Sequence, residues 1–226
     1  MPAKSRLLQK YVALENIANH MVKLQNTMTR KRIFKTWPAL PIRARRVGTD
    51  WGGWWMPEEV FLQNNKPTII SCGLGHDISF DLEMVSHGFR VLGIEIDSDA
   101  IDQLRRNFEI PEAMQMYIGR VGRLTSQSMS LWDLMRLDEF HEEKSEYILK
   151  MDIEGAEMEV LPDLISSYVR FPIVVFELDY LSLIPFSSFV LRELRIREVL
   201  QLFASLNALG YRPFIVENWN VHLVRY

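Results

Sequence analysis

The chain has 226 residues, of which 48% are hydrophobic, 24% charged and 11% aromatic, and this composition fits one globular domain with a small appendage and excludes wholesale disorder. Its single cysteine, Cys72, excludes an internal disulfide and a multi-cysteine zinc site, so we expect a reducing compartment. No apolar run reaches the roughly 20 residues that a membrane span needs, and the N-terminus lacks the apolar stretch of a signal peptide. We therefore expect a cytoplasmic protein without a transmembrane segment.

The net charge of −3 conceals an asymmetry between the N-terminus and the rest of the chain. Residues 1–50 contain eleven Lys and Arg but only Glu15 and Asp50 as acids, giving +9, so the remainder carries −12. Such a basic arm docks on its own acidic body, on a second subunit, or on an anionic membrane surface or glycan. Because its cationic cluster at residues 30–35 contains a single aromatic residue, Phe34, for base stacking, we expect no nucleic acid as a partner.

The arm itself is predicted to be a helix that ends before Pro38 and Pro41. Residues recur at alternating spacings of four and three along one side of it, namely Leu7, Tyr11, Leu14, Ala18, Met21, Gln25 and Met28. This stripe predicts either packing onto the main domain or a homodimer formed through the N-terminal helix. We place the arm and a linker-like stretch at residues 1–47 and the main domain at 48–226.

From Pro67 onward, short apolar runs alternate with helical patterns, which predicts βαβ units and a parallel sheet. Strands are predicted at residues 68–71, 91–96, 115–119, 146–152 and 173–179. Helices are expected after the first, second and fourth strands, the last of them ended or kinked by Pro162, and a long helix is expected over 186–209. A hairpin around Trp219 would complete an α/β, doubly wound, mostly parallel sheet with an antiparallel C-terminal pair. Its ligand would lie at the carboxyl ends of the strands.

The first predicted strand runs into "SCGLGHD", residues 71–77, where Gly73 and Gly75 allow a sharp turn and the close approach of a ligand. Glu95 ends the second strand twenty residues after Gly75, a spacing that suits a carboxylate binding both hydroxyls of a ribose. Asp77 stands directly before the position, here Ile78, where a dinucleotide-binding loop has its third glycine. Its charge would repel a pyrophosphate but suits an ammonium or sulfonium, so the turn favours S-adenosylmethionine over NAD.

The second motif, "KMDIEGAEMEVL" at residues 150–161, places Asp152, Glu154 and Glu157 within six residues. Asp152 ends a strand next to the predicted switch point of the sheet, where a functional role is favoured. For Glu157 the alternative is an acid that stabilises a helix N-terminus.

Five segments carry a resemblance to a known family: "SCGLGHDISFD", "GIEIDSDA", "MSLWDLM", "LKMDIEGAEMEVL" and "PIVVFELDY". In this order, over residues 48–180, they resemble the FkbM family of S-adenosylmethionine-dependent methyltransferases. "VGTDWGGWW" also resembles a segment that precedes the first strand in related proteins, with Trp51 inserted between Asp50 and Gly52. The resemblance implies a class I methyltransferase fold with strand order 3-2-1-4-5-7-6. It also implies methyl transfer to a hydroxyl oxygen of a carbohydrate or secondary-metabolite acceptor.

The motifs and the resemblance together give a predicted site. The donor site would comprise Ser71, Cys72, Gly73, Gly75, Asp77, Glu95, Ile96, Asp97, Gly119, Val121 and Asp152, and the acceptor would be bordered by Asp50, Trp54 and Glu177. The candidate bases for the hydroxyl proton are Asp152, Glu154 and His76, although a loop histidine such as His76 more often faces solvent. A divalent metal on Asp152, Glu154 and Glu177 is conceivable, but no ligand spacing demands one.

Three alternatives stay open at this point. Trp51, Trp54 and Trp55 either line a sugar-binding surface or fix the arm to the domain. An NAD(P)-dependent oxidoreductase is the second enzyme class to consider, disfavoured by Asp77. The chain could also be a non-catalytic, methyltransferase-like scaffold subunit.

Overall fold

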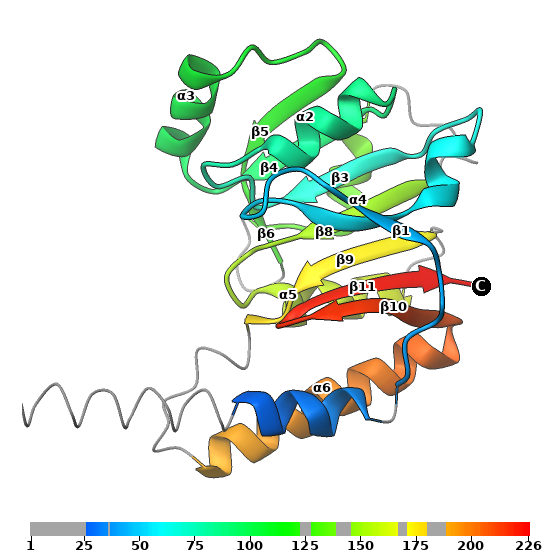
Figure 1. Ribbon diagram of the computed structural model, residues 1–226. Helices are drawn as coiled ribbons and strands as arrows, with labels where there is room; N and C mark the ends of the chain where they lie inside the picture. Colours follow the sequence, from blue (N-terminus) through cyan, green and yellow to red (C-terminus); the bar gives the residue numbers. More distant parts are fainter. Residues whose placement is uncertain (1–25, 36, 123–127, 139–145, 167–170, 180–188) are drawn as a thin grey trace, which may run out of the picture.

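Seven strands form one central mixed sheet with helices on both faces, giving three layers (Figure 1). The structure is a computed structural model that describes residues 26–35, 37–122, 128–138, 146–166, 171–179 and 189–226. Along the sheet the strands are β10 (Tyr211–Glu217), β11 (Asn220–Arg225), β9 (Ile173–Glu177), β8 (Tyr147–Met151), β3 (Thr68–Cys72), β4 (Val91–Glu95) and β5 (Met114–Ile118). All neighbours are parallel except β11, which runs antiparallel to both β9 and β10. Counted from β3, this is the expected order 3-2-1-4-5-7-6, and the class I methyltransferase fold is confirmed.

The central strands are apolar throughout because both faces of the sheet are covered. Every residue of β3 and β8 is buried, and successive side chains alternate between two hydrophobic cores. Ile69 and Ile148 belong to one core, whereas Ile70 and Leu149 belong to the other. The sheet order reverses between β3 and β8, so the carboxyl ends of these two strands form the switch point.

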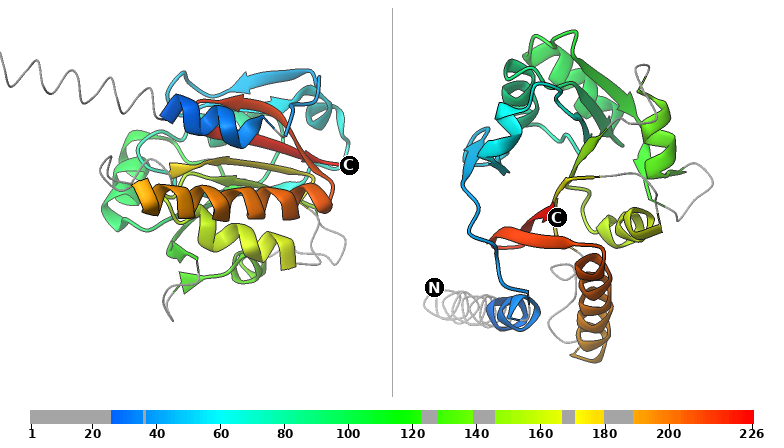
Figure 2. Two further views of the ribbon diagram at one scale, coloured as in Figure 1. Left: turned by 90° about the horizontal axis from the view of Figure 1, so that it is seen from below. Right: turned by 90° about the vertical axis from the view of Figure 1, so that its right-hand side faces the viewer.

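Each face of the sheet has its own cover (Figure 2). One core is closed by α2 (Ser79–Ser86), α3 (Ser98–Asn107) and the hairpin of β1 (Ala44–Val47) and β2 (Trp54–Pro57). The other core is closed by α4 (Leu131–Arg136), α5 (Glu157–Ser166) and α6 (Phe189–Ala208). The smaller elements are η1 (Glu58–Leu62), β6 (Arg120–Val121) and β7 (Ser128–Met129).

Two expectations about local structure are corrected. Helix α5 does not end at Pro162 but continues to Ser166, because the missing hydrogen bond of the proline is offset by the burial of Leu161 and Leu164 on either side. The linker expected before residue 48 contains β1, which pairs with β2, and Val47, Trp54 and Met56 of this hairpin are buried against the sheet. The expected boundary after residue 47 falls at the end of β1, and the division into arm and domain stays a prediction.

The described part of the N-terminal arm is helical over residues 26–34 and lies along α6 (Figures 1 and 2). Ile33 and Trp37 are buried in the core under α6, where the Trp37 ring lies 4.7 Å from that of Phe203. Arg32 forms an ion pair with Glu193 at 2.7 Å. This part of the arm therefore docks on the chain's own body.

Met28, the last residue of the expected stripe, is 65% exposed, because the buried side of this helix passes through Thr29 and Ile33 instead. The rest of the stripe lies outside the described residues, and a homodimer through it stays a prediction. None of the helices in the described part of the chain has the length and hydropathy needed to cross a bilayer.

Candidate active site

A cavity of about 740 Å³ opens at the carboxyl ends of β3, β4 and β8, where the sheet order reverses. Most of the predicted site residues line it, namely Trp54, Gly73, Gly75, His76, Asp77, Glu95, Ile96, Gly119, Val121, Asp152 and Glu154. The ligand site predicted from the turn after the first strand therefore coincides with this cavity.

The turn after β3 requires glycine at Gly73. Its φ of 79° lies in the left-handed region, and a Cβ atom there would stand 1.7 Å from the carbonyl oxygen of Asp152. Because the backbones of the two turns meet here, the loop after β3 and the loop after β8 form one continuous floor. The amide of Asp152 extends this contact by donating to the carbonyl of Cys72 at 2.9 Å.

Glu95 holds this turn in place from the end of β4. Its Oε2 accepts hydrogen bonds from the amides of Leu74 (3.0 Å) and Gly75 (2.9 Å), and its Oε1 accepts from the amide of Asp97 (3.0 Å). The side chain is 8% exposed and lines the cavity. A carboxylate has about four acceptor positions, so these three bonds leave room for a ribose hydroxyl.

Asp77 joins the turn to the loop between β1 and β2. Its Oδ2 accepts from the hydroxyl of Thr49 at 2.6 Å, and its Oδ1 accepts from the amide of Ser79 at 2.8 Å. Partial burial acts to raise the pKa of Asp77, but the hydrogen bonds from Ser79, Thr49 and Gly52 together hold this pKa below its usual range. Asp77 is therefore a stable anion at the cavity wall.

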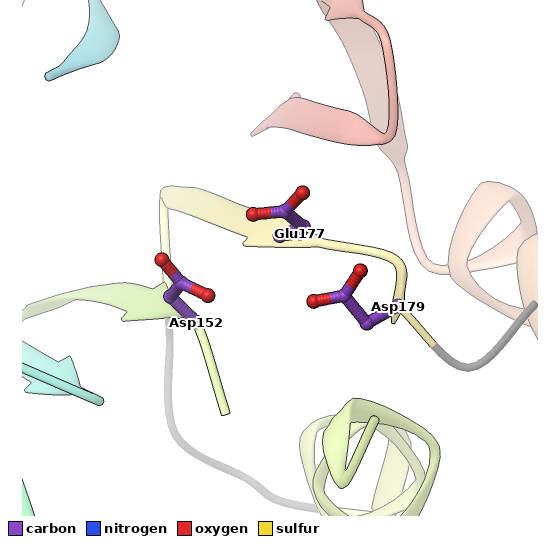
Figure 3. Close-up of side chains that lie close together, drawn as sticks. All are labelled: Asp152, Glu177 and Asp179. Atoms are coloured by element: carbon purple, nitrogen blue, oxygen red, sulfur yellow. The ribbon is translucent and has the colours of Figure 1, made fainter. Parts of the chain in front are cut away.

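The expected acceptor side contains a cluster of three carboxylates. Oxygen atoms of Asp152, Glu177 and Asp179 lie within 4.8 Å of one another, and the three side chains turn toward a common space at the ends of β8 and β9 (Figure 3). Such a group offers oxygen ligands of the kind that hold a divalent cation. It differs from the conceivable metal set because Asp179 stands in the place of Glu154.

Burial and mutual repulsion shift the pKa values of this cluster. Burial raises the pKa of Asp152; the ammonium of Lys150 opposes this shift, and the charges of Asp179 and Glu95 add to it. The pKa of Glu177 is raised to about 7 by burial and then by the charges of Asp179 and Asp152. Carboxyl groups with raised pKa values can exchange a proton near neutral pH.

Glu154 and Glu157 follow Asp152 but lie in different environments. Glu154 is exposed at the cavity with a left-handed φ of 54°, and burial followed by the charge of Asp179 raises its pKa. Glu157 is fully buried, and its Oε1 accepts from the amides of Ile153 and Gly155 at 3.2 Å each. Burial raises the pKa of Glu157 to about 7 despite these bonds. Glu157 therefore fixes the loop after β8 from inside the core.

The remaining predicted residues lie outside the cavity lining. The side chains of Ser71 and Cys72 are fully buried within β3, and burial raises the pKa of the Cys72 thiol to about 12. Asp97 caps α3 by accepting from the amide of Asp99. Asp50 is exposed, and its carbonyl accepts from Arg46. Glu177 lies in the carboxylate cluster beside the lining residue Asp152.

Sequence reasoning missed three charged residues here: Lys150, Arg120 and Asp179. Lys150 is only 4% exposed, lines the cavity and donates from Nζ to the carbonyl of Gly73. The sequence signal for Lys150 was its place within the otherwise apolar run "YILKM". A lysine in a buried strand needs a polar partner, so this pattern could have identified it as a candidate site residue. Arg120 also lines the cavity and pairs with Glu159 at 3.3 Å. Asp179 lies two residues after the end of β9. From this segment the sequence analysis named Glu177 as a site residue but not Asp179.

Comparison with known proteins agrees with the fold. The family described as "Methyltransferase FkbM domain" matches residues 42–213. No curated protein matches the chain.

Several solved structures resemble the chain at low identity. WbdD is 18% identical over 71% of this chain and 36% of its own, with a TM-score of 0.45. A putative caffeoyl-CoA O-methyltransferase from Staphylococcus aureus is 12% identical over 97% of this chain and 100% of its own, with a TM-score of 0.43. Human N-acetylserotonin methyltransferase in complex with SAM is 13% identical over 70% of this chain and 47% of its own, with a TM-score of 0.38. The chain thus spans about a third of WbdD and about half of the human enzyme, and these likenesses are too distant to indicate an acceptor.

Proposed function

The chain belongs to the FkbM family of S-adenosylmethionine-dependent methyltransferases, and from this premise we propose that it methylates a hydroxyl oxygen of a carbohydrate or secondary-metabolite acceptor. The observation that carries the proposal is the position of Asp152. It lines the cavity behind the glycine turn and also belongs to the carboxylate cluster with raised pKa values. One carboxylate therefore borders both the expected donor space and the expected acceptor space.

The residues of the cavity fit the methyl donor. Its volume of about 740 Å³ lies in the usual range for small-molecule sites. Gly73 and Gly75 allow close approach, Glu95 retains acceptor capacity for a ribose, and Asp77 is an anion suited to a cationic ligand. When bound, S-adenosylmethionine supplies a methyl carbon activated by a positively charged sulfur.

The chain's own part in catalysis is to orient the hydroxyl and remove its proton. Asp152 is the first candidate base, since its pKa is raised and it lies at the cavity. In this proposal the hydroxyl oxygen forms a bond to the methyl carbon, the carbon–sulfur bond breaks, and the proton moves to the carboxylate. Glu177 and Asp179 would tune Asp152 through repulsion, and Glu154 and His76 border the same space as further candidates.

A phosphate-bearing cofactor fits this site less well. The two cations of the lining are already engaged, Lys150 with the carbonyl of Gly73 and Arg120 with Glu159 and Ser128. Asp77 and Glu95 would both repel a pyrophosphate near the turn. Together with the family membership, this argues against the NAD(P)-dependent oxidoreductase.

Titration calorimetry with S-adenosylhomocysteine, the product of the donor, tests the proposal. We expect saturable binding by the folded protein and no binding of NADH at the same concentration. A folded sample that does not bind S-adenosylhomocysteine contradicts the proposed function. A scaffold subunit would also bind the ligand without turnover, and the Asp152→Asn variant described below separates that case.

A further inference from the structure

Trp51 is the most exposed large apolar residue among those described, with 93% of its surface in contact with solvent. It nevertheless lines the same cavity as Gly73 and Gly75. A tryptophan in water leaves a large apolar area unburied, which is unfavourable unless something covers it. Its neighbours in the same motif differ, because Trp54 is 3% exposed against the sheet and the Trp55 Nε1 donates to Glu217 at 3.2 Å.

The loop that carries Trp51 is firmly attached on both sides of it. Before Trp51, the amide of Gly48 donates to Glu83 at 2.8 Å and the amide of Thr49 donates to the hydroxyl of Ser79 at 2.9 Å. After Trp51, the amide of Gly52 donates to the hydroxyl of Thr49 at 3.0 Å, closing a short turn. Arg46 adds a hydrogen bond to the carbonyl of Asp50 at 2.9 Å. The position of Trp51 is thus set by its neighbours.

Close packing of the loop backbone on the donor turn reinforces this position. A Cβ atom on Gly52 would stand 2.5 Å from Cγ of Asp77, and one on Gly53 would stand 2.3 Å from the carbonyl oxygen of Thr49. The glycines therefore allow the loop to lie directly against Asp77. A tryptophan carried by a backbone that is fixed in this way is preorganised for binding at the level of the loop, because little loop freedom is lost when a ligand covers the ring.

More of the loop's attachments go to the donor side than to the acceptor side. Asp77, Ser79 and Glu83, in the turn after β3 and in α2, bind loop residues 48 and 49. Arg46, which binds the carbonyl of Asp50, pairs with Glu217 at the end of β10. Glu177 and Asp179, on the expected acceptor side, are not among the described residues that line the cavity with Trp51. An aromatic face suits both the adenine and the sulfonium of the expected donor.

We propose that Trp51 is a donor-binding residue and that loop 48–53 is the outer wall of the S-adenosylmethionine site. This inference rests on the proposed function, since it assumes that the cavity holds this donor. It differs from both roles expected for Trp51 from sequence, which were a sugar-binding surface and attachment of the arm. Trp54 also lines the cavity but is buried against the sheet, and Trp55 binds Glu217.

Titration calorimetry with S-adenosylhomocysteine on four proteins tests the inference: wild type, Trp51→Ala, Trp51→Phe and Trp132→Ala. Trp132, which is 48% exposed on α4 and lies outside the cavity lining, is the matched control. We expect Trp51→Ala to raise the Kd about tenfold, Trp51→Phe to raise it less than threefold, and Trp132→Ala to leave it unchanged. Thermal unfolding should show the same Tm for all four proteins, since neither tryptophan is buried.

A second readout uses tryptophan fluorescence. Adding S-adenosylhomocysteine should change the emission of the wild type and of Trp132→Phe, and most of this change should be lost in Trp51→Phe. If the wild type binds and Trp51→Ala has a Kd within twofold of it, the inference is overturned and the proposed function stands. If the wild type does not bind, the proposed function fails and the inference fails with it.

Discussion

On the side of the cavity proposed for the donor, the carboxylates of Asp77 and Glu95 accept hydrogen bonds from backbone amides of the turn after β3 and the loop after β4. On the side proposed for the acceptor, those of Asp152, Glu177 and Asp179 face one another at the ends of β8 and β9 (Figure 3). The residue type is the same, but the partners differ. The pKa of Asp77 is held low, whereas burial and like charges raise those of Asp152 and Glu177.

The comparison separates structural carboxylates from reactive ones. Asp77 is only partly buried and accepts several hydrogen bonds, so it is fixed in position and stays ionised: it can build a binding site but cannot take up a proton near pH 7. A carboxylate crowded by others holds its proton more readily and can act as a base. Substitutions on the donor side should therefore affect folding and binding, and those on the acceptor side should affect turnover and its pH dependence.

The largest expected effect is that of Asp152→Asn on turnover. Removing the base should lower the rate of S-adenosylhomocysteine formation by about 100- to 1,000-fold, with the Kd for S-adenosylhomocysteine within about threefold of wild type. Single-turnover assays with acceptor, together with circular dichroism to confirm the fold, measure this. Full activity in the variant would mean that Asp152 is not the base.

Glu95→Ala should instead destabilise the turn after β3, on the side proposed for the donor. The amides of Leu74, Gly75 and Asp97 would lose their acceptor, so the free energy of unfolding should fall by about 2–3 kcal/mol and donor affinity should fall with it. Urea denaturation gives the first value and calorimetry the second. Glu95→Gln, which keeps one acceptor oxygen, should show a smaller loss of stability. A variant as stable as wild type would show that these bonds do not hold the turn.

Glu177→Gln should move the pH dependence of turnover. In the wild type the cluster loses a proton near the pKa of about 7 at Glu177, so turnover should rise through that pH. Removing one negative charge beside Asp152 lowers the pKa of the remaining group, so the midpoint should move down by about one unit. Rates measured from pH 5 to 9 check this, and an unchanged midpoint would show that the two carboxyl groups are not coupled.

Glu157→Gln should stabilise the protein at high pH. The folded pKa of Glu157, about 7, lies above its unfolded value of 4.5, so its favourable contribution is complete below pH 4.5 and is lost as the pH rises through 7. The neutral amide avoids that loss, so at pH 8 the free energy of unfolding should rise by about 1 kcal/mol, with little difference from wild type at pH 4.5. Denaturation of the variant and the wild type at pH 4.5 and pH 8 measures this difference. Equal stability of the two proteins at pH 8 would show that a charge on Glu157 does not destabilise the fold.

The smallest expected effect is that of Thr49→Val on the donor side. The variant keeps the shape of the side chain but removes the 2.6 Å hydrogen bond to Asp77 and the acceptor of the Gly52 amide, so stability at pH 7 should fall by about 0.5–1 kcal/mol. Because the pKa of Asp77 is lowered in the folded state, the part of this difference that comes from Asp77 should fade as the pH drops below about 3.8. Thr49→Ser is the matched control and should behave as wild type. A loss that persists unchanged in acid would point to packing rather than the hydrogen bond.

Long apolar runs made the sheet predictable from the sequence, whereas short elements did not. The runs "TIIS" and "VLGIEI" can be buried on both faces only as central strands, and they form β3 and β4. The four-residue strands β1 and β2 were missed because each is short, and β1 contains two arginines, Arg45 and Arg46, in place of an apolar run.

The site was predictable only in part for a similar reason. Strand ends identified Glu95 and Asp152 as candidates, because parallel strands bring their carboxyl ends to one edge. Spacing along the chain carries no information about which carboxylates meet across that edge. The contact of Asp179 with Asp152 and the partner of buried Lys150 both depend on how the loops close in three dimensions.

The N-terminal helix has a consequence for synthesis of the protein. Trp37 packs on Phe203 and donates to Asn207, a partner 170 positions later in the chain. At ribosomal rates of synthesis this partner is made on the order of ten to thirty seconds after Trp37. During this time the apolar side chains of Ile33 and Trp37, which are buried in the folded protein, are exposed to solvent. A chaperone that binds nascent apolar segments has its natural target there until α6 is made.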